Sequence, residues 1–505
     1  MISYRASHLI FLFVFALPLV GNAQQFPVSD ADLDAYTKAS FPLLKELYSI
    51  PNDAFYLDDI EKNIQWCEAN FPKTGFTTRR IPTKRAPLLL AERDYGSKKT
   101  VLVYLQLDGQ PVDSTRWAQE HPFKPALKKK NDKGLWEEIP WDAIENYEDD
   151  WRIFVRAASD AKGPVGMFLT AMDIAEKEGI RPNYNLKIIM DFEEEMGSPN
   201  LPMAVKQNAE LLKTDMLIIF DGPRHITNRP TLTFGARGIA TVQLTTYGPF
   251  LAQHSGHFGN YAPNPALRLS KLLASMKDDD GRVLIPGFYD GVTISPEVER
   301  ILKNVPDNEA QIKNRLQIAE TDKVGRYYQE AIQYPSLNIR GMQSGWINEK
   351  VRTIIPGWAR AEIDIRLVKE TDPERLISLV RNHIQDQGYL VLDSIPRRGL
   401  RLTHGKIATF TYEISYQSFR TDFDSDVGLW LRRALKNAFG EEPIMIRMSG
   451  GSIPISPFVN TLGIPAVTVP TVNRDNNQHS PNENIRLGNY REGIKTMVAI
   501  LNEKL

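Results

Sequence analysis

Segments typical of buried strands alternate with segments typical of helices from residue 100 onward. Apolar runs at 100–108, 185–195 and 215–222 have the length and composition of strands. Between them, residues 163–179 and 202–212 have a helical pattern. A strand–helix–strand order predicts a parallel sheet covered by helices. We therefore expect an α/β fold with a mostly parallel sheet flanked by helices.

The middle of the chain has a different pattern. Residues 238–248 and 361–368 alternate apolar and polar side chains, which is typical of strands with one solvent-facing side. Two amphipathic helical segments and a third strand accompany them, at 264–278, 372–388 and 409–416. This order predicts a separate open sheet with helices on one face, inserted into the first domain, with residues 279–350 as an excursion within it.

The first pattern returns after residue 421, with a helical segment at 425–440 and a short buried strand at 464–471. We therefore expect one main domain that is interrupted by the inserted one. The expected divisions are a signal peptide at 1–23, the first part of the main domain at 24–233, the inserted domain at 234–420 and the second part of the main domain at 421–505.

The N-terminal segment has the pattern of a signal peptide. Arg5 supplies a positive charge, residues 9–20 are apolar, and the small residues Gly21 and Ala23 precede a cleavage point before Gln24. The apolar run is shorter than the ~20 residues of a membrane-spanning helix, which disfavours the alternative of an uncleaved anchor. We expect an exported protein, periplasmic or secreted, with no membrane anchor after cleavage.

Charge and cysteine content exclude several classes of protein. The formal net charge is −1, so nothing indicates binding to nucleic acid or to an anionic membrane surface. Cys67 is the only cysteine, which excludes an intrachain disulfide and a thiolate metal cluster.

Acidic residues collect where the predicted strands end. Asp108, the run 193–195 and Asp221 each follow a strand, Asp160 precedes a helix, and His479 lies in a late loop. Singly, these residues are typical of caps, turns and solvated loops. Ligands of parallel α/β sheets bind at the carboxyl ends of the strands, and carboxylates gathered there repel unless a cation compensates them. Together they predict a metal site built from carboxylates and one imidazole.

Eight short motifs, in order from about residue 40 to the C-terminus, resemble the M20 family of metallopeptidases, and within it the carnosinase-like dipeptidases. The motifs are LQLDGQPVD, RAASDAKGP, EEEMGSP, IIFDGPRH, HSGHFGN, RTIIPGWARAEIDIR, SGGSIP and HSPNE. The resemblance implies a zinc-peptidase type of α/β fold, with an inserted α+β lid and dimerisation domain, and a hydrolase with two metal ions.

The resemblance also implies the roles of the acidic residues. Asp160 matches the aspartate that bridges both metals. Glu195 and His479 match the other ligands of one metal, for which we expect zinc, and Asp221 matches a ligand of the second metal. Glu194 matches the general base, which takes a proton from the attacking water.

In the inserted domain, His254 matches a histidine that acts across a homodimer to stabilise the oxyanion. Without the flanking motif, a surface loop histidine would be the simpler interpretation. The resemblance thus implies a homodimer held by the lid domain.

Three further residues match substrate contacts of the family. Arg366 matches the arginine that binds the substrate carboxylate, and Thr353 and Ser452 match supporting contacts. From the pattern alone, an ion pair of Arg366 with Glu362 or Asp364 is an equally good explanation. The SGGS motif lacks the frame of a serine nucleophile, so we reject that mechanism.

Two positions depart from the family. Gln106 stands where the family has a histidine ligand, and Ser449 stands where it has a glutamate. Asp108, which in the family orients that histidine, lies two residues beyond Gln106 and so on the same face of the strand. We predict that the Gln106 oxygen faces the metal while its NH2 group donates to Asp108.

Gln106 also leads us to expect unequal metal sites. A site of Gln106, Asp160 and Asp221 offers only oxygen ligands and favours manganese, magnesium or calcium. The site of Asp160, Glu195 and His479 favours zinc. The alternative is that Gln106 only hydrogen-bonds Asp108 and that the protein works with one metal.

The leading functional prediction is hydrolysis of the amide bond of dipeptides or small peptides. Two alternatives stay open. One is hydrolysis of N-acyl amino acids, since the same groups can cut any amide next to a carboxylate. The other is a binding protein descended from a peptidase that lost a metal at Gln106.

Overall fold

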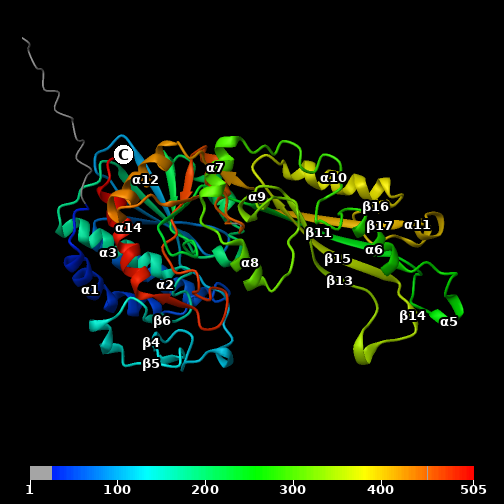
Figure 1. The fold of residues 1–505 in the computed structure, drawn as a ribbon, viewed down its shortest axis with the longest axis horizontal. Helices are drawn as coiled ribbons and strands as arrows, with labels where there is room; N and C mark the ends of the chain where they lie inside the picture. Colours follow the sequence, from blue (N-terminus) through cyan, green and yellow to red (C-terminus); the bar gives the residue numbers. More distant parts are fainter. Residues whose placement is uncertain (1–25, 452) are drawn as a thin grey trace, which may run out of the picture.

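The computed structural model describes residues 26–451 and 453–505, so the predicted signal peptide and Ser452 lie outside the described residues. The chain forms two bodies side by side along the long axis (Figure 1). One body contains an eight-stranded sheet between helices, and the other contains a five-stranded sheet. Among the described helices, none is long and apolar enough to cross a membrane.

The eight-stranded sheet is mixed. Its strands, in spatial order, are β1 (Thr77–Ile81), β2 (Leu88–Arg93), β7 (Asn185–Asp191), β3 (Thr100–Gln106), β8 (Met216–Ile219), β20 (Ala466–Thr468), β9 (Thr231–Thr233) and β19 (Ile444–Ile446). The central strand β3 runs parallel to β7 and β8, and β8 runs parallel to β20. Strands β1 and β2 add an antiparallel edge, and β20 pairs with β9 in antiparallel fashion.

Helices cover both faces of this sheet, as the alternation of side chains along β3 requires. Val101 and Val103 pack into the core on one face, whereas Leu102 and Tyr104 pack into the core on the other. The first face carries α1 (Asp30–Tyr48), α2 (Leu57–Asn70), α3 (Lys162–Lys177), α12 (Asp426–Phe439) and α14 (Leu487–Asn502), and the second carries α4 (Leu201–Gln207) and α13 (Ser456–Leu462).

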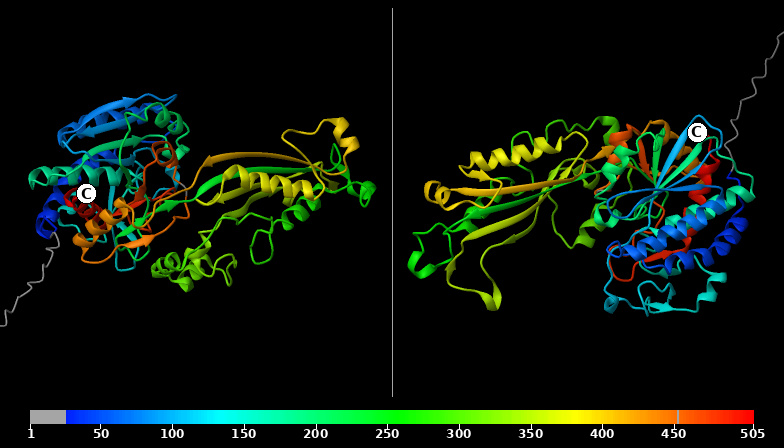
Figure 2. Two further views of the ribbon diagram at one scale, coloured as in Figure 1. Left: turned by 90° about the horizontal axis from the view of Figure 1, so that it is seen from above. Right: turned by 180° about the vertical axis from the view of Figure 1, so that it is seen from behind.

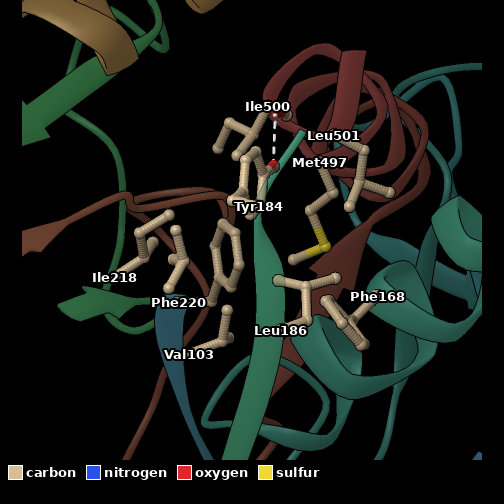
Figure 3. A pocket seen from close by; sticks show the side chains of 10 residues that line it. Val103, Phe168, Tyr184, Leu186, Ile218, Phe220, Met497, Ile500 and Leu501 are labelled. Atoms are coloured by element: carbon tan, nitrogen blue, oxygen red, sulfur yellow. Dashed lines mark hydrogen bonds between the residues drawn. The ribbon is translucent and has the colours of Figure 1, made fainter. Parts of the chain in front are cut away.

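The core under α14 contains a cavity of about 10 Å³ (Figure 3). Val103, Phe168 and Met497 are among the apolar side chains that line it, and the Tyr184 hydroxyl at its edge already donates to the Ile500 carbonyl at 2.9 Å. Such a space is barely the size of one water molecule and offers it no free polar partner. The cavity is therefore a packing feature and not a binding site.

The second body is inserted in sequence between β9 and α12. Its sheet has the order β13 (Ser336–Gln343), β15 (Trp358–Leu367), β11 (Gly238–Tyr247), β17 (Ile407–Tyr416) and β16 (Leu390–Leu392). Helices α6 (Pro265–Ala274) and α10 (Pro373–Asp386) pack on one face, each with a proline in its first turn and a side-chain cap, Asn264 or Asp372. We call this body the inserted sheet.

The structure adds elements that the sequence patterns missed. Residues 279–350 are not merely an excursion, because they supply β13 of the inserted sheet as well as α7 (Pro296–Asn304), α8 (Glu309–Leu316) and α9 (Tyr328–Ala331). The tryptophan-rich connection after β3 forms, with a late segment, a further sheet of β21 (Asn484–Arg486), β6 (Arg152–Phe154), β4 (Ala126–Lys130) and β5 (Trp136–Glu138).

Short elements lie at the two ends of the inserted sheet. At the end remote from the eight-stranded sheet, β12 (Gln253–His254) pairs with β14 (Ile354–Ile355) beside α5 (Ser255–Phe258) (Figures 1 and 2). At the near end, β10 (Gly235–Ala236) pairs with β18 (Phe419–Arg420). The chain enters the inserted sheet after β10 and leaves it at β18, so the two connections between the bodies lie side by side.

Candidate metal centre and active site

Asp160, Glu195 and His479 come together at the carboxyl end of the eight-stranded sheet. His479 Nε2 lies 2.9 Å from Asp160 Oδ2 and 3.2 Å from Glu195 Oε2. One ligand atom from each of the three lies within 4.8 Å of the others. Asp160 precedes α3, Glu195 follows β7, and His479 belongs to the loop before β21, so only the tertiary fold joins them.

The electrostatics of this cluster favour a cation. Burial and the neighbouring carboxylates of Asp221 and Asp160 raise the pKa of Glu194 well above its usual range. Burial and Asp160 raise the pKa of Asp221 to about 7. Hydrogen bonds to Asp160 and Glu195 raise the pKa of His479 to about 10. Two carboxylates and one imidazole around one point fit a divalent metal ion, which would compensate the crowded negative charge.

The three consecutive glutamates have three different environments. Glu193 is buried and forms an ion pair with Arg85 at 2.9 Å, so its role is structural. Glu195 faces His479 and also accepts from Gln110 Nε2 at 2.8 Å. The carboxylate of Glu194 accepts no hydrogen bond from another described residue, which leaves it available to a substrate or a water.

Gln106 does not make the predicted contact. Its Nε2 donates to Asp160 Oδ1 at 2.8 Å, whereas Asp108 Oδ2 accepts from the backbone N–H of Glu195 at 2.9 Å. The prediction that the Gln106 NH2 group donates to Asp108 is therefore wrong. The physical reason is that Asp160, from another loop, offers a carboxylate acceptor to the same amide.

Two buried acceptor atoms remain beside this contact. Gln106 Oε1 and Asp108 Oδ1 have no hydrogen-bond partner among the described residues, and both side chains are almost fully buried. A buried acceptor without a donor costs about 1–3 kcal/mol. These oxygens are thus groups that a cation, or a water held by one, could satisfy.

Glu483 is a functional candidate that the sequence patterns did not identify. Its carboxylate accepts from Arg156 Nη1 at 2.7 Å and from the backbone N–H groups of Ala157, Ser159 and Asp160 at 3.0–3.1 Å. Glu483 therefore holds the loop that presents Asp160. A signal was present, because Glu483 closes the HSPNE motif that also contains the candidate ligand His479.

Replacing Glu483 by glutamine should destabilise the protein strongly. All four groups around the carboxylate are donors, and an amide NH2 cannot accept from any of them. The Arg156 and Glu483 side chains are only 3% and 1% exposed, and breaking such a buried pair costs ~3–5 kcal/mol. Urea denaturation at pH 8 measures the change in the free energy of unfolding.

The matched control for this measurement is Asp173→Asn. Asp173 forms an ion pair with Lys177 in which both side chains are about half exposed. Removal of that pair should cost ~1 kcal/mol or less. Equal losses in the two variants would contradict the role of Glu483.

The structure does not bring His254 and Thr353 to the metal cluster within one chain. Both lie at the remote end of the inserted sheet, where the Ser255 N–H donates to the Thr353 carbonyl at 2.9 Å (Figures 1 and 2). His254 is exposed, and its Nδ1 accepts from the Gly256 N–H at 3.0 Å.

Arg366 and Ser449 lie elsewhere. Arg366 lies on β15, and its Nε is 3.6 Å from Asp364 Oδ2. This contact is one of the two ion pairs that the sequence left open. The Ser449 hydroxyl donates to the Gly451 carbonyl at 3.1 Å. Ser452, the remaining predicted substrate contact, lies outside the described residues.

Comparisons with known proteins agree with these observations. The model of the family "Peptidase family M20/M25/M40" matches residues 106–503. The chain is 27% identical over 83% of its length to the Cys-Gly metallodipeptidase dug1 of Schizosaccharomyces pombe, of which it covers 82%. It is 28% identical over 83% of its length to the human Beta-Ala-His dipeptidase, of which it covers 77%.

Solved structures give the same result. An M20 family metallo-carboxypeptidase from Sulfolobus solfataricus, Sso-CP2, superposes with a TM-score of 0.74 at 28% identity, over 92% of this chain and 98% of that one. The resemblance predicted from the eight motifs, including the one to carnosinase-like dipeptidases, is confirmed. The chain belongs to peptidase family M20/M25/M40 and is a metallopeptidase of that family.

Proposed function

We propose that this protein hydrolyses the amide bond of dipeptides, with Glu194 as general base. The observation that supports this most directly is the cluster of Asp160, Glu195 and His479 with the unengaged carboxylate of Glu194 beside it. The names of the relatives support the substrate class, since they describe Cys-Gly and Beta-Ala-His dipeptidases.

The residues of the site can supply the two functions that amide hydrolysis needs, which are metal binding and proton transfer. A divalent metal ion held by Asp160, Glu195 and His479 would polarise a carbonyl group and make a water molecule more acidic. The Glu194 carboxylate accepts the proton of the attacking water, and the same oxygen then delivers it to the nitrogen of the leaving amine.

We further propose that the metal sites are unequal. Zinc suits Asp160, Glu195 and His479, because these residues include an imidazole ligand. A second site of Gln106, Asp160 and Asp221 would have only oxygen ligands and hold a weaker, exchangeable ion such as manganese. The buried Gln106 Oε1, which has no partner among the described residues, supports an interaction of this amide with a cation.

The active unit proposed is a homodimer formed through the inserted sheet, which acts as a lid. Exposed apolar side chains flank β12 and β14, among them Phe250, Leu251, Trp346 and Ile347. Such exposed apolar groups favour association. A dimer would also explain why His254, matched to an oxyanion-stabilising histidine, is remote from the cluster of its own chain.

Mixing two inactive variants tests the dimer. His254→Ala and Glu194→Gln each lack one group of the proposed site, and a hybrid dimer restores one complete site. We expect activity to reappear after subunit exchange, at up to about a quarter of the parent rate if exchange is statistical and each site acts alone. No recovery, with exchange proven by mass spectrometry of labelled subunits, would contradict action across the dimer.

A substrate screen tests the proposed function. The purified protein, loaded with zinc, manganese or cobalt, should hydrolyse Cys-Gly or β-Ala-His. C-terminally amidated analogues should react poorly, because Arg366 is proposed to bind the free carboxylate, and an amide offers this guanidinium no negative charge. Faster hydrolysis of N-acetyl amino acids would favour the amidohydrolase alternative. Metal binding without hydrolysis of any of these would favour a binding protein.

We also propose that the mature protein is exported, periplasmic or secreted. The proposal rests on Arg5, the apolar run at 9–20 and the small residues before Gln24. N-terminal sequencing of the protein from the cell envelope or medium, with Gln24 as the expected first residue, tests it.

A further inference from the structure

The hydroxyl group of Tyr416 lies against the turn that carries Glu194 and Glu195. A β-carbon built on Gly197 would be 2.2 Å from Tyr416 Oη but 3.4 Å from its Cζ. The first distance is a severe overlap, whereas the second is an ordinary contact. Glycine at position 197 thus leaves the space that the tyrosine hydroxyl fills, at the point where the inserted sheet reaches the active site.

A bulge in the inserted sheet accompanies Tyr416. Strand β17 ends at this residue, and its register with β11 shifts there, with Ile239 opposite Tyr416 but Ala240 opposite Ile414. Ser415 therefore has no partner in this pairing. Bulges of this kind re-aim neighbouring side chains and are common next to active sites. The sheet is distorted where Tyr416 reaches the glutamate turn.

The environment of the hydroxyl agrees with this placement. Burial, together with the negative charges of Glu194 and Asp191, raises the pKa of Tyr416 to about 12. The hydroxyl donates to no described residue, so its contact with the turn is one of shape and not a hydrogen bond.

The glutamate turn is short, and Gly197 takes part in its hydrogen bonding. It is a single 3-10 turn, Glu194–Met196, closed by the Gly197 N–H donating to the Glu194 carbonyl at 2.7 Å. Gly197 has a φ of +84°, which non-glycine residues rarely adopt. A displacement at Gly197 is therefore transmitted directly to Glu194, and a misplacement of ~1 Å in an active site can reduce rate ~10²-fold.

We propose that Tyr416 is a positioning residue, which presses on Gly197 and so fixes the turn that presents the base Glu194 and the metal ligand Glu195. The placement of both glutamates then depends on the inserted sheet of the same chain. This inference rests on the proposed function, because it assigns Glu194 and Glu195 the roles given above.

A double-mutant cycle tests the contact. Gly197→Ala in the parent should lower kcat ~10²-fold with KM within ~2-fold, and should weaken zinc binding ~10-fold in competition with a chelator. Tyr416→Phe removes the one atom that overlaps the new methyl group and keeps the ring. In that background Gly197→Ala should cost less than ~5-fold in kcat, so that the two changes are strongly non-additive.

Two control variants separate this effect from general ones. Gly440 has a φ of +73° and nothing within 4 Å of a built β-carbon, so Gly440→Ala introduces the same backbone strain without an overlap. It should lower the melting temperature but leave kcat and zinc affinity unchanged. Tyr412, on the same strand, is exposed and donates to Glu374 at 2.9 Å, so Tyr412→Phe should not rescue Gly197→Ala.

The outcomes are distinct. Rescue of kcat and of zinc affinity by Tyr416→Phe, but not by Tyr412→Phe, supports the proposal. A mild effect of Gly197→Ala in the parent, additive effects, or coupling seen only in the melting temperature overturns it. A parent protein that neither binds zinc nor hydrolyses Cys-Gly overturns the proposed function instead, and with it the roles on which the inference rests.

Discussion

Glu194→Gln should reduce kcat by ~10²–10⁴-fold while the protein stays folded and keeps its metal. Glutamine has the shape of glutamate but cannot take a proton from water. The Glu194 carboxylate has no described hydrogen-bond partner whose loss would destabilise the fold, so the effect should be confined to catalysis. Steady-state kinetics on Cys-Gly, together with metal analysis of the variant, measures both parts.

The neighbouring glutamates provide matched controls. Glu195→Gln should lose metal as well as activity, because Glu195 faces His479 and Asp160 in the cluster. Glu193→Gln weakens the buried pair with Arg85 and should mainly lower stability. Turnover by Glu194→Gln at the parent rate would show that Glu194 is not the base.

Titration of the metal-free protein should reveal one tightly held zinc ion and one weak, exchangeable ion, with added manganese raising the activity. Gln106→His should tighten zinc at the weak site by ~100-fold or more, since changes even to outer-shell groups alter metal affinity ~10–100-fold. An imidazole nitrogen is a better zinc ligand than an amide oxygen. Chelator competition and metal analysis give the stoichiometry and both affinities without an activity assay.

His479→Ala serves as the control in this titration. It removes the imidazole of the cluster, so the tight zinc should be lost whereas the weak ion should be affected less. Two equally tight zinc ions in the parent protein would contradict unequal sites. Full activity with a single ion would favour the alternative of a protein that works with one metal, in which the Gln106 amide donates to Asp160 and not, as that alternative expected, to Asp108.

The sequence by itself determined the fold class and the family. Strand β3 is buried on both faces, so its run of apolar residues was readable without knowing its neighbours. The alternation of apolar and polar residues in β11 and β15 revealed the inserted sheet, because a strand with one covered face has a buried side chain at every second residue. The excursion at 279–350 hid β13, because most of this edge strand is exposed and burial imposes no pattern on it.

Only the tertiary structure decided which polar atoms meet. Their positions on one face of the strand led us to expect a hydrogen bond between Gln106 and Asp108. The Gln106 amide instead donates to Asp160, which belongs to a distant loop. The three consecutive glutamates have different partners, and their sequence does not indicate which. Arg85 binds Glu193, whereas His479 faces Glu195. Apolar burial depends on local periodicity, which a sequence displays, whereas a hydrogen bond depends on angstrom-scale approach of segments that the fold alone brings together.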